Sequence, residues 1–540
     1  MADLFFRTED IKPDEVQKYF VETQSDREVV NALKGHNPII LAGSRGVGKS
    51  FLLRVAESEL KKEMTQNHAF PVYVSFTKSS LIFTKVEQQF QHWMLARICS
   101  RLVRALEQAG LLGAFPKSVS ILSGGGSSLQ SFAGKLAIER IADAFEESWK
   151  QTTANVDLSG LPTIDEFRDT IEDLCGDLKL RRVIFLIDEA AHIFLPEQQR
   201  QFFTLFRDLR SPYISCKAAV YPGVTSYGET FQPIHDATML SLDRDVLGTS
   251  FVDTMREIVE KQAGSDLLAE IARHRENFAI LAYAASGNPR VLLKTVAKTP
   301  RVAAQQVNEV IREYYRNDIW AEHSTLPEKY PGHRTLIDWG RQFIENEVLP
   351  DLQKKNVQYL ENPQSPQSTC FFWIHRDVPQ PVKEALRLLA YTGIVKEHAS
   401  GMKATRSEIG TRYAVNLGCL FALEATPTTS ALRIAQNLAP KRMSEFGVNH
   451  AAYQNLLKTV PTFSEPDLGE VLRRQLGKSI AVLDITDWQL QRLRELGLTT
   501  IGDVLHASET KLQEIAYVGE VRSRRMRNAA MAAVYEYLSG

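Results

Sequence analysis

A glycine-rich segment near the N-terminus has the residue types and the spacing needed to hold a polyphosphate. It reads Gly43-Ser-Arg-Gly-Val-Gly-Lys49-Ser50 and follows a short apolar stretch. Glycines let the backbone curl so that successive N–H groups point at phosphate oxygens, and a helix that begins there adds a partial positive charge. The spacing fits the pattern of a phosphate-binding loop. The expected nucleotide-binding residues are Gly43, Ser44, Arg45, Gly46, Val47, Gly48, Lys49, Ser50 and Phe51.

Two acidic residues further along the chain fit the same chemistry. Residues 182–187 form an apolar run of the kind that is buried on both faces of a parallel sheet, and Asp188 and Glu189 follow it. A carboxylate at that strand end lies beside a phosphate loop, so Asp188 is expected to hold Mg²⁺ through water while Glu189 polarises the attacking water. Lys49 is expected to reach the β- and γ-phosphates, and the Ser50 hydroxyl to ligate the metal. The expected cofactors are therefore ATP and Mg²⁺.

The segments that would position these residues alternate between strands and helices. The predicted strands are residues 38–42, 70–76, 182–187, 216–224 and 238–242. Residues 80–180 are predicted to form a long, largely helical insertion that contains a flexible segment, residues 118–128. Strands that alternate with helices indicate a parallel sheet with right-handed crossovers. The sequence therefore predicts an α/β P-loop NTPase core.

A second candidate phosphate contact lies in a helical region after the last predicted strand, at residues 286–290 (Ser-Gly-Asn-Pro-Arg). With the phosphate loop and the acidic strand end, this region resembles the lid of AAA+ and STAND ATPases. The Gly-Asn-Pro-Arg segment is similar to the second sensor of origin-recognition and Cdc-six type initiator ATPases. The resemblance implies that Arg290 reaches the γ-phosphate from the lid and reports the nucleotide state. The alternative is a surface arginine after an Asn-Pro helix start.

The same resemblance implies a first sensor, a polar residue at the end of the strand after the acidic one. Residues 220–226 end that strand here, and Thr225 or Ser226 can fill the role. Thr225 is therefore grouped with Lys49, Glu189 and Arg290 as a predicted catalytic residue.

An arginine finger, which AAA+ rings carry on the helix after that strand, has no obvious counterpart. The sequence contains no arginine between Lys217 and Asp243. Arg207 and Arg210 on the preceding predicted helix can substitute, but a solvated helix face explains them equally well. This departure favours a slow, switch-like ATPase or one that is activated by a partner.

A module that could touch nucleic acid follows the lid. A predicted helix over residues 381–391, followed by a hairpin, resembles a winged helix. Lys403 and Arg406 at the hairpin tip could rest on DNA phosphates. Initiator ATPases and STAND proteins both place such a module here, so DNA contact and internal packing remain equally open.

The C-terminal unit, residues 479–540, resembles helix-hairpin-helix domains, in which backbone N–H groups at a glycine turn contact DNA phosphates. Gly519 matches the turn glycine, but Ala516 and Tyr517 stand where such motifs usually have Pro-Gly. The predicted DNA contacts of this unit are Gly519, Arg522, Arg524, Arg525 and Arg527. The alternatives are a solvated basic helix and a protein-docking module.

Composition limits the remaining choices. The net charge of -1 means that any affinity for nucleic acid comes from local basic patches. No apolar run reaches the roughly 18–20 residues that span a bilayer, and the N-terminus lacks a signal-peptide pattern. The five cysteines are far apart and include no Cys-x-x-Cys pair, which argues against a zinc site or a disulfide framework. A cytoplasmic protein without membrane contact is expected.

The sequence thus predicts an ATPase core with a parallel sheet, a helical lid, a winged-helix-like module and a small all-α C-terminal domain. The predicted boundaries are 1–248 for the core, 249–322 for the lid, 323–425 for the helical and winged-helix-like domain, 426–478 for a connecting region and 479–540 for the last unit.

Three functional hypotheses remain. The first is a nucleotide-switched ATPase that binds double-stranded DNA. The second is a STAND-type signalling ATPase, for example in antiviral defence, and the third is a target adaptor for transposition or recombination. In each case a protein partner or effector chain is expected, and an ATP-dependent oligomer is an option.

Overall fold

The computed structural model describes most of the chain. The described residues are 4–538, without residues 77–86, 112–116, 125–135, 147–155, 190–195, 224, 226, 229, 330–332, 405–406, 460–474 and 484. Part of the predicted flexible segment, residues 118–128, and both Arg406 and Ser226 therefore lie outside the described residues.

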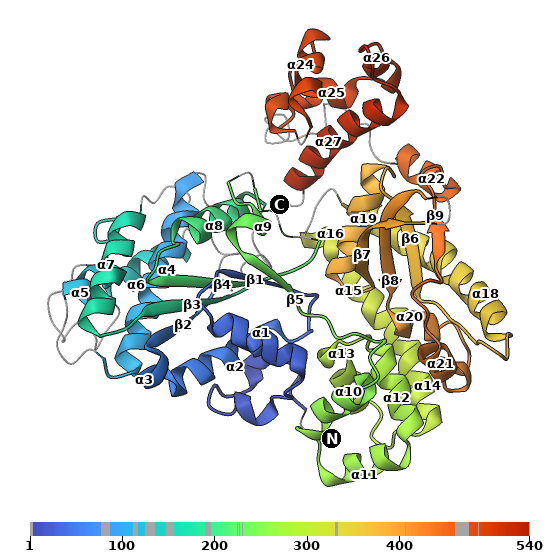
Figure 1. Ribbon diagram of the computed structural model, residues 1–540, viewed down its shortest axis with the longest axis horizontal. Coiled ribbons are helices and arrows are strands. Elements are labelled where there is room, and N and C mark those ends of the chain that lie inside the picture. Colours follow the sequence, from blue (N-terminus) through green and yellow to red (C-terminus); the bar gives the residue numbers. More distant parts are fainter. Residues whose placement is uncertain are drawn as a thin grey trace.

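A five-stranded sheet forms the centre of the N-terminal lobe (Figure 1). Its strands run in the order β2-β3-β4-β1-β5, and every neighbouring pair is parallel. Their bounds are β1 (Ile39–Ala42), β2 (Ala69–Ser75), β3 (Arg182–Asp188), β4 (Ile214–Val220) and β5 (Thr238–Ser241). The predicted α/β core with a parallel sheet is confirmed.

Helices cover both faces of this sheet because successive side chains of a strand point to opposite faces. On β3, Ile184 and Leu186 pack with the core beneath α1 and α2, whereas Phe185 and Ile187 pack with the larger core beneath α4 and α6–α8. The helices of this lobe are α1 (Gln24–Lys34), α2 (Lys49–Lys62), α3 (Met64–Asn67), α4 (Glu87–Gln108), α5 (Lys117–Leu122), α6 (Ala137–Glu146), α7 (Ile164–Asp177), α8 (Pro196–Asp208) and α9 (Pro233–Asp236).

The chain then forms a helical lid and a run of further helices. The lid contains α10 (Phe251–Glu260), α11 (Ser265–Arg273), α12 (Arg275–Ala284), α13 (Pro289–Ala297) and α14 (Ala304–Glu313). The next helices are α15 (Ile319–Ser324), α16 (Leu326–Lys329), α17 (Arg334–Phe343) and α18 (Leu349–Leu360). One continuous hydrophobic core joins the lid, these helices and the sheet that follows.

A second sheet contains the predicted winged-helix-like module. Its strand order is β7-β8-β6-β9, in which β7 and β8 form an antiparallel hairpin. The elements are β6 (Phe371–His375), α19 (Gln380–Tyr391), β7 (Val395–Lys403), β8 (Ile409–Val415) and β9 (Ser444–Phe446), with α20 (Leu417–Phe421), α21 (Pro427–Gln436) and α22 (Ala451–Thr459) around them. We call residues 371–415 the hairpin domain.

The C-terminal unit has a small hydrophobic core of its own. It contains α24 (Asp487–Glu495), α25 (Ile501–His506), α26 (Glu509–Gln513) and α27 (Glu520–Leu538). Thr486 and Thr500 each begin a helix with a reciprocal capping box, which satisfies N–H groups of the first turn. Figure 1 shows α27 running down between the two lobes, where it contacts both α19 and α8.

None of the helices in the described part of the chain is both long and apolar enough to span a bilayer.

Candidate nucleotide-binding site

The predicted phosphate loop connects β1 to α2, and its backbone requires glycine at two positions. Gly46 has φ 89° and Gly48 has φ 109°, which are conformations that residues with a side chain rarely adopt. At Gly46 there is also no room, since a Cβ would lie 2.8 Å from the Asn288 side-chain oxygen and 2.9 Å from the Arg290 Cβ. The loop is therefore curled tightly and closely covered by the lid.

Lys49, the first residue of α2, is buried beneath this loop with only 5% of its surface exposed. Its Nζ donates hydrogen bonds to the carbonyl oxygens of Gly43 (2.6 Å) and Ser44 (3.1 Å). The same ammonium lies 3.8 Å from the centroid of the Tyr221 ring. Burial lowers the pKa of Lys49 to about 7, although the negative charge of Asp188 opposes this shift.

Asp188 and Glu189 stand at the carboxyl end of β3, beside the loop. Asp188 is 4% exposed and accepts hydrogen bonds from the Tyr73 hydroxyl (2.6 Å) and from the Glu189 backbone N–H (2.9 Å). Glu189 has φ 56°, an uncommon backbone conformation that often marks functional sites. Burial raises the pKa of Glu189 to about 7, and the charge of Asp188 adds to the rise.

Glu189 also has the geometry of a carboxylate that is free to bind a further group. Its Oε2 atom is buried and has no hydrogen-bond partner in the described structure. A carboxylate with a pKa near 7 is well suited to take a proton from water at neutral pH.

The residues present fit a magnesium ion. The Ser50 hydroxyl and the Asp188 carboxylate supply oxygen atoms, which are the ligands that Mg²⁺ prefers, and Mg²⁺ usually keeps several waters and binds substrate phosphates. Among the described residues, no group of three or more His, Cys, Asp or Glu side chains could hold a metal. The rest of the coordination would therefore come from phosphate and water.

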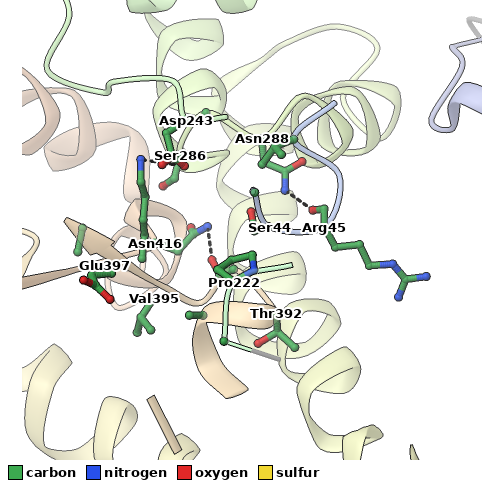
Figure 2. Close-up of a pocket in the computed structure, with 18 of the residues that line it drawn as sticks. Ser44, Arg45, Pro222, Asp243, Ser286, Asn288, Thr392, Val395, Glu397 and Asn416 are labelled. Atoms are coloured by element: carbon green, nitrogen blue, oxygen red, sulfur yellow. Dashed lines mark hydrogen bonds and ion pairs between the residues drawn. The ribbon is translucent and has the colours of Figure 1, made fainter. Parts of the chain in front are cut away.

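The lid is attached directly to the phosphate loop through the cap of α13. The Asn288 side chain accepts hydrogen bonds from the N–H groups of Arg290 (3.1 Å) and Val291 (3.3 Å), and it donates one to the Arg45 carbonyl (2.8 Å; Figure 2). Arg290 itself is largely buried, and its Nε donates to the Phe6 carbonyl (3.0 Å). Burial lowers the pKa of Arg290, and the nearby guanidinium of Arg45 acts in the same direction.

A large cavity adjoins the outer side of the phosphate loop. Its volume is ≈ 1160 Å³, and it lies between the loop, the lid, the segment after β5 and the hairpin domain (Figure 2). Arg45 of the loop also forms an ion pair with Glu322 of α15 (2.8 Å). The phosphate loop is thus surrounded by elements from several parts of the chain.

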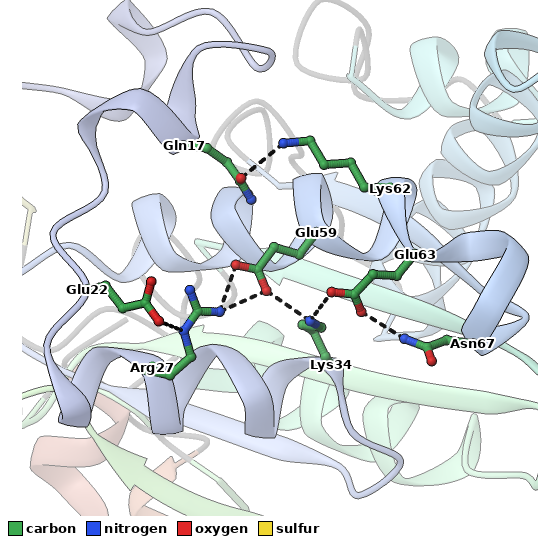
Figure 3. Close-up of polar contacts among 8 residues, drawn as sticks. All are labelled: Gln17, Glu22, Arg27, Lys34, Glu59, Lys62, Glu63 and Asn67. Carbon is green, nitrogen blue, oxygen red and sulfur yellow. Dashed lines mark hydrogen bonds and ion pairs between the residues drawn. The ribbon is translucent and has the colours of Figure 1, made fainter.

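An ion-pair network holds α2, the helix that begins at Lys49, against α1 (Figure 3). Glu59 binds both Arg27 (2.8 Å) and Lys34 (2.9 Å), and Lys34 also binds Glu63 (2.7 Å). These side chains are only partly exposed, so the network fixes the direction of α2 more firmly than isolated surface pairs would.

The segment after β4 is where the sequence predicted a first sensor without fixing which residue fills that role. Thr225 lies beyond the end of β4, and its hydroxyl donates to the Tyr221 carbonyl (2.7 Å). Tyr221 follows β4 directly and faces Lys49, and its pKa is raised by burial and by the charges of Asp188 and Glu189. Thr225 stays a prediction, and sequence reasoning missed Tyr221. Tyr221 stands immediately after the strand β4, and that position is the sequence signal that could have identified it.

The arginines of the C-terminal unit do not form a single patch. Arg522 is exposed, donates to the Tyr517 carbonyl (2.6 Å) and lies over the Trp488 ring. Arg525 instead forms an ion pair with Asp377 of the hairpin domain (3.2 Å). Arg524 and Arg527 are partly buried.

The two predicted turn contacts differ from these arginines. Lys403 is exposed at the end of β7. Gly519 borders open space, while the unusual positive φ (67°) of this turn falls on Tyr517, where such motifs usually have glycine. The DNA contacts all stay predictions.

Comparison with protein-family models matches residues 5–359 to the model described as ORC-CDC6-like. This match spans most of the chain. The chain belongs to the ORC-CDC6-like family. The predicted resemblance to initiator ATPases is confirmed.

Comparison with solved structures finds the following similarities to this ORC-CDC6-like chain. The ORC1 protein of Aeropyrum pernix in complex with DNA has 14% identity and a TM-score of 0.30, with 78% of this chain and 95% of that chain covered. The ORC2 protein of Aeropyrum pernix, in ADPNP–ADP complexes, has 11% identity, a TM-score of 0.36 and coverage of 78% and 96%. AMPPCP-bound DnaA from Aquifex aeolicus has 13% identity, a TM-score of 0.25 and coverage of 62% and 84%. These similarities are too low to bear on the activity of this chain, and no curated protein sequence matches it.

Lys49→Ala tests the site of this ORC-CDC6-like protein. Loss of the ammonium that is predicted to reach the phosphates is expected to weaken ATP binding about 10²- to 10³-fold, as measured by titration with a fluorescent ATP analogue. The thermal midpoint should not fall, because the substitution removes a buried cation. Lys62→Ala at the other end of α2 is the matched control, since Lys62 is exposed and its ammonium donates a hydrogen bond to Gln17, away from the loop. Unchanged ATP affinity in Lys49→Ala would refute the assignment of the loop.

Glu189→Gln tests the proposed base. ATP affinity should persist, while the hydrolysis rate falls about 10²- to 10⁴-fold because the amide cannot accept the proton. In the wild type, kcat/KM should fall about tenfold per pH unit below 7, since a carboxyl whose pKa is about 7 is progressively protonated there. In Glu189→Gln, the residual kcat/KM should not show this fall below pH 7. A pH profile that is the same in both proteins would exclude Glu189 as the base.

Proposed function

We propose that this chain binds ATP with Mg²⁺, hydrolyses the nucleotide slowly, and uses the nucleotide state to control its binding to double-stranded DNA. The observation that carries the ATPase part is that Lys49 donates to a carbonyl of the phosphate loop while Asp188 and Glu189 lie close enough to act on its charge. Membership of the ORC-CDC6-like family supports the same reading.

The lid contact supports a switch rather than simple turnover. Asn288 links α13 to the loop carbonyl of Arg45, and Arg290 follows on the same helix. A triphosphate that attracts the Arg290 guanidinium would change the position of the lid relative to the phosphate loop. Hydrolysis, which removes the γ-phosphate, would reverse that change.

A slow rate follows from the groups available for catalysis within the chain. Arg207, one of the two substitutes for an arginine finger, donates to the Thr230 carbonyl (2.6 Å) and pairs with Asp208 (2.8 Å). An additional cation from a protein partner or from a second copy in an ATP-dependent oligomer would raise the rate, as arginine fingers do.

DNA binding is proposed for two surfaces, the exposed arginines of α27 and the tip of the β7–β8 hairpin. Arg522 and Lys403 are exposed cations of these surfaces, and Arg525 is also exposed but pairs with Asp377. Contacts of this kind neutralise phosphates without reading bases, so binding should be salt-sensitive and tolerant of sequence.

A STAND-type signalling ATPase is the second candidate, and one observation favours it. The hairpin domain contacts the segment beside the predicted nucleotide site. Lys396 of β7 forms an ion pair with Asp243 of the segment after β5 (3.1 Å). ATPase rate with and without duplex DNA, measured together with mass in the presence of an ATP analogue, separates the two. Stimulation by DNA without assembly supports the DNA-binding switch, and assembly without DNA supports signalling.

The double variant Arg522→Glu with Arg524→Glu is expected to weaken duplex binding. The slope of log K against log salt should become shallower by about 0.9 for each phosphate contact that is lost, as measured by fluorescence anisotropy at several salt concentrations. Arg256→Glu with Arg273→Glu on the lid changes the charge equally and should leave binding unchanged. Absence of DNA affinity in the wild type at every salt concentration would contradict the proposal.

A further inference from the structure

Helix α19 of the hairpin domain is seated against the loop that follows β4. The Arg387 Nε donates to the Gly223 carbonyl (2.7 Å), and the buried Glu384 carboxylate holds the Arg387 guanidinium at 2.8 and 3.0 Å. Gly223 has φ 81°, and a Cβ there would lie 2.2 Å from the Arg387 carbonyl oxygen. The approach is so close that only glycine fits it.

The last residue of α19 contacts the tyrosine that faces the phosphate-binding lysine. The Tyr391 and Tyr221 rings are 5.7 Å apart and meet edge to face at 68°. The Tyr221 ring lies 3.8 Å from the Lys49 ammonium. Tyr221 is therefore held between α19 and Lys49, and its own carbonyl is fixed by the Thr225 hydroxyl.

The turn after α19 covers the outer side of the phosphate loop. A Cβ built on Gly393 would lie 3.8 Å from the Ser44 Cβ, and the Lys396–Asp243 ion pair follows on β7. Two separate contacts of the hairpin domain thus flank the nucleotide site, one at the loop after β4 and one at the phosphate loop.

Lys49 has three N–H donors, and its surroundings already engage them. Two carbonyl oxygens of the phosphate loop accept hydrogen bonds, and the Tyr221 ring faces the ammonium. A lysine that reaches β- and γ-phosphates has to give up at least part of these contacts. The Tyr221 ring, which α19 holds next to Lys49, makes it less favourable for the ammonium to leave these contacts for the phosphates.

We propose that Tyr221 is a positioning residue through which docking of the hairpin domain opposes triphosphate binding at Lys49. The inference rests on the proposed ATP binding and adds its regulation. Coupling between two binding events is reciprocal. A bound triphosphate therefore weakens the docking of α19 against the loop after β4 by the same factor by which docking weakens ATP binding.

The geometry offers a test by a cross-link between Ser44→Cys and Gly393→Cys. Because Ser44 belongs to the predicted nucleotide-binding loop and Gly393 has φ 76°, the oxidised double variant is compared with its own reduced form. The separation of 3.8 Å matches the usual Cβ–Cβ distance in disulfides. The native cysteines are all buried, so oxidation should act on the introduced pair. The oxidised double variant is expected to bind a non-hydrolysable ATP analogue at least about tenfold more weakly than the same protein after reduction. Equal affinity in the two forms would overturn the inference.

A second set of variants loosens docking without a cross-link. Arg387→Ala removes the bond to Gly223, and Tyr221→Leu removes the aromatic ring, so both are expected to bind the analogue about threefold to tenfold more tightly. Tyr221→Phe keeps the ring and should bind as the wild type does, whereas a general packing defect would weaken binding in all of them. Weaker or unchanged binding in both Arg387→Ala and Tyr221→Leu overturns the inference.

The outcomes also separate this inference from the proposed function. If the wild type and the reduced double variant bind the analogue but the cross-link has no effect, only the role of Tyr221 fails. If neither protein binds the analogue, the proposed ATP binding fails and the inference fails with it.

Discussion

A buried ammonium group is the constraint around which the N-terminal lobe is organised. Lys49 is almost fully removed from water, and its hydrogen bonds go to backbone carbonyls rather than to a carboxylate. Burial of a cation is costly unless an anion compensates it, which is why the pKa of Lys49 falls to about 7. A polyphosphate in the curl of the loop would supply the missing charge. Under the proposed function, the two glycines with positive φ, the start of α2 and the acidic end of β3 would together place that anion.

The same loop is also the meeting point of the rest of the chain. The lid reaches it through Asn288, the helix α15 through the Glu322–Arg45 ion pair, and the hairpin domain through Gly393. Helix α27 in turn contacts the hairpin domain, since Arg525 forms an ion pair with Asp377 near the start of α19. A change at the loop therefore has a physical route of contacts to the hairpin domain and to the C-terminal unit.

Much of this could be predicted from the sequence, because the signals are local. The spacing of Gly43–Ser50, the apolar run before Asp188 and the Asn-Pro-Arg helix start each depend on a few neighbouring residues, and the structure brings all of them to one loop. Tyr221 could not be found in this way. Its proposed role depends on the direction of its ring, which contacts Tyr391 of α19 from a distant part of the sequence. Likewise, the pattern of α27 gives no hint that Arg525 pairs with Asp377 while Arg522 donates to the Tyr517 carbonyl.

The most direct measurement is the number of protons exchanged when Mg–ATP binds. Calorimetric titrations of the Glu189→Gln protein at pH 8, in buffers with different heats of ionisation, leave Lys49 as the nearby group with a pKa of about 7. A bound polyphosphate raises that pKa, so the account predicts uptake of about one proton per nucleotide. Binding without proton uptake would contradict the lowered pKa of Lys49 in the free protein, and no binding at all would contradict the claim that this loop holds a polyphosphate.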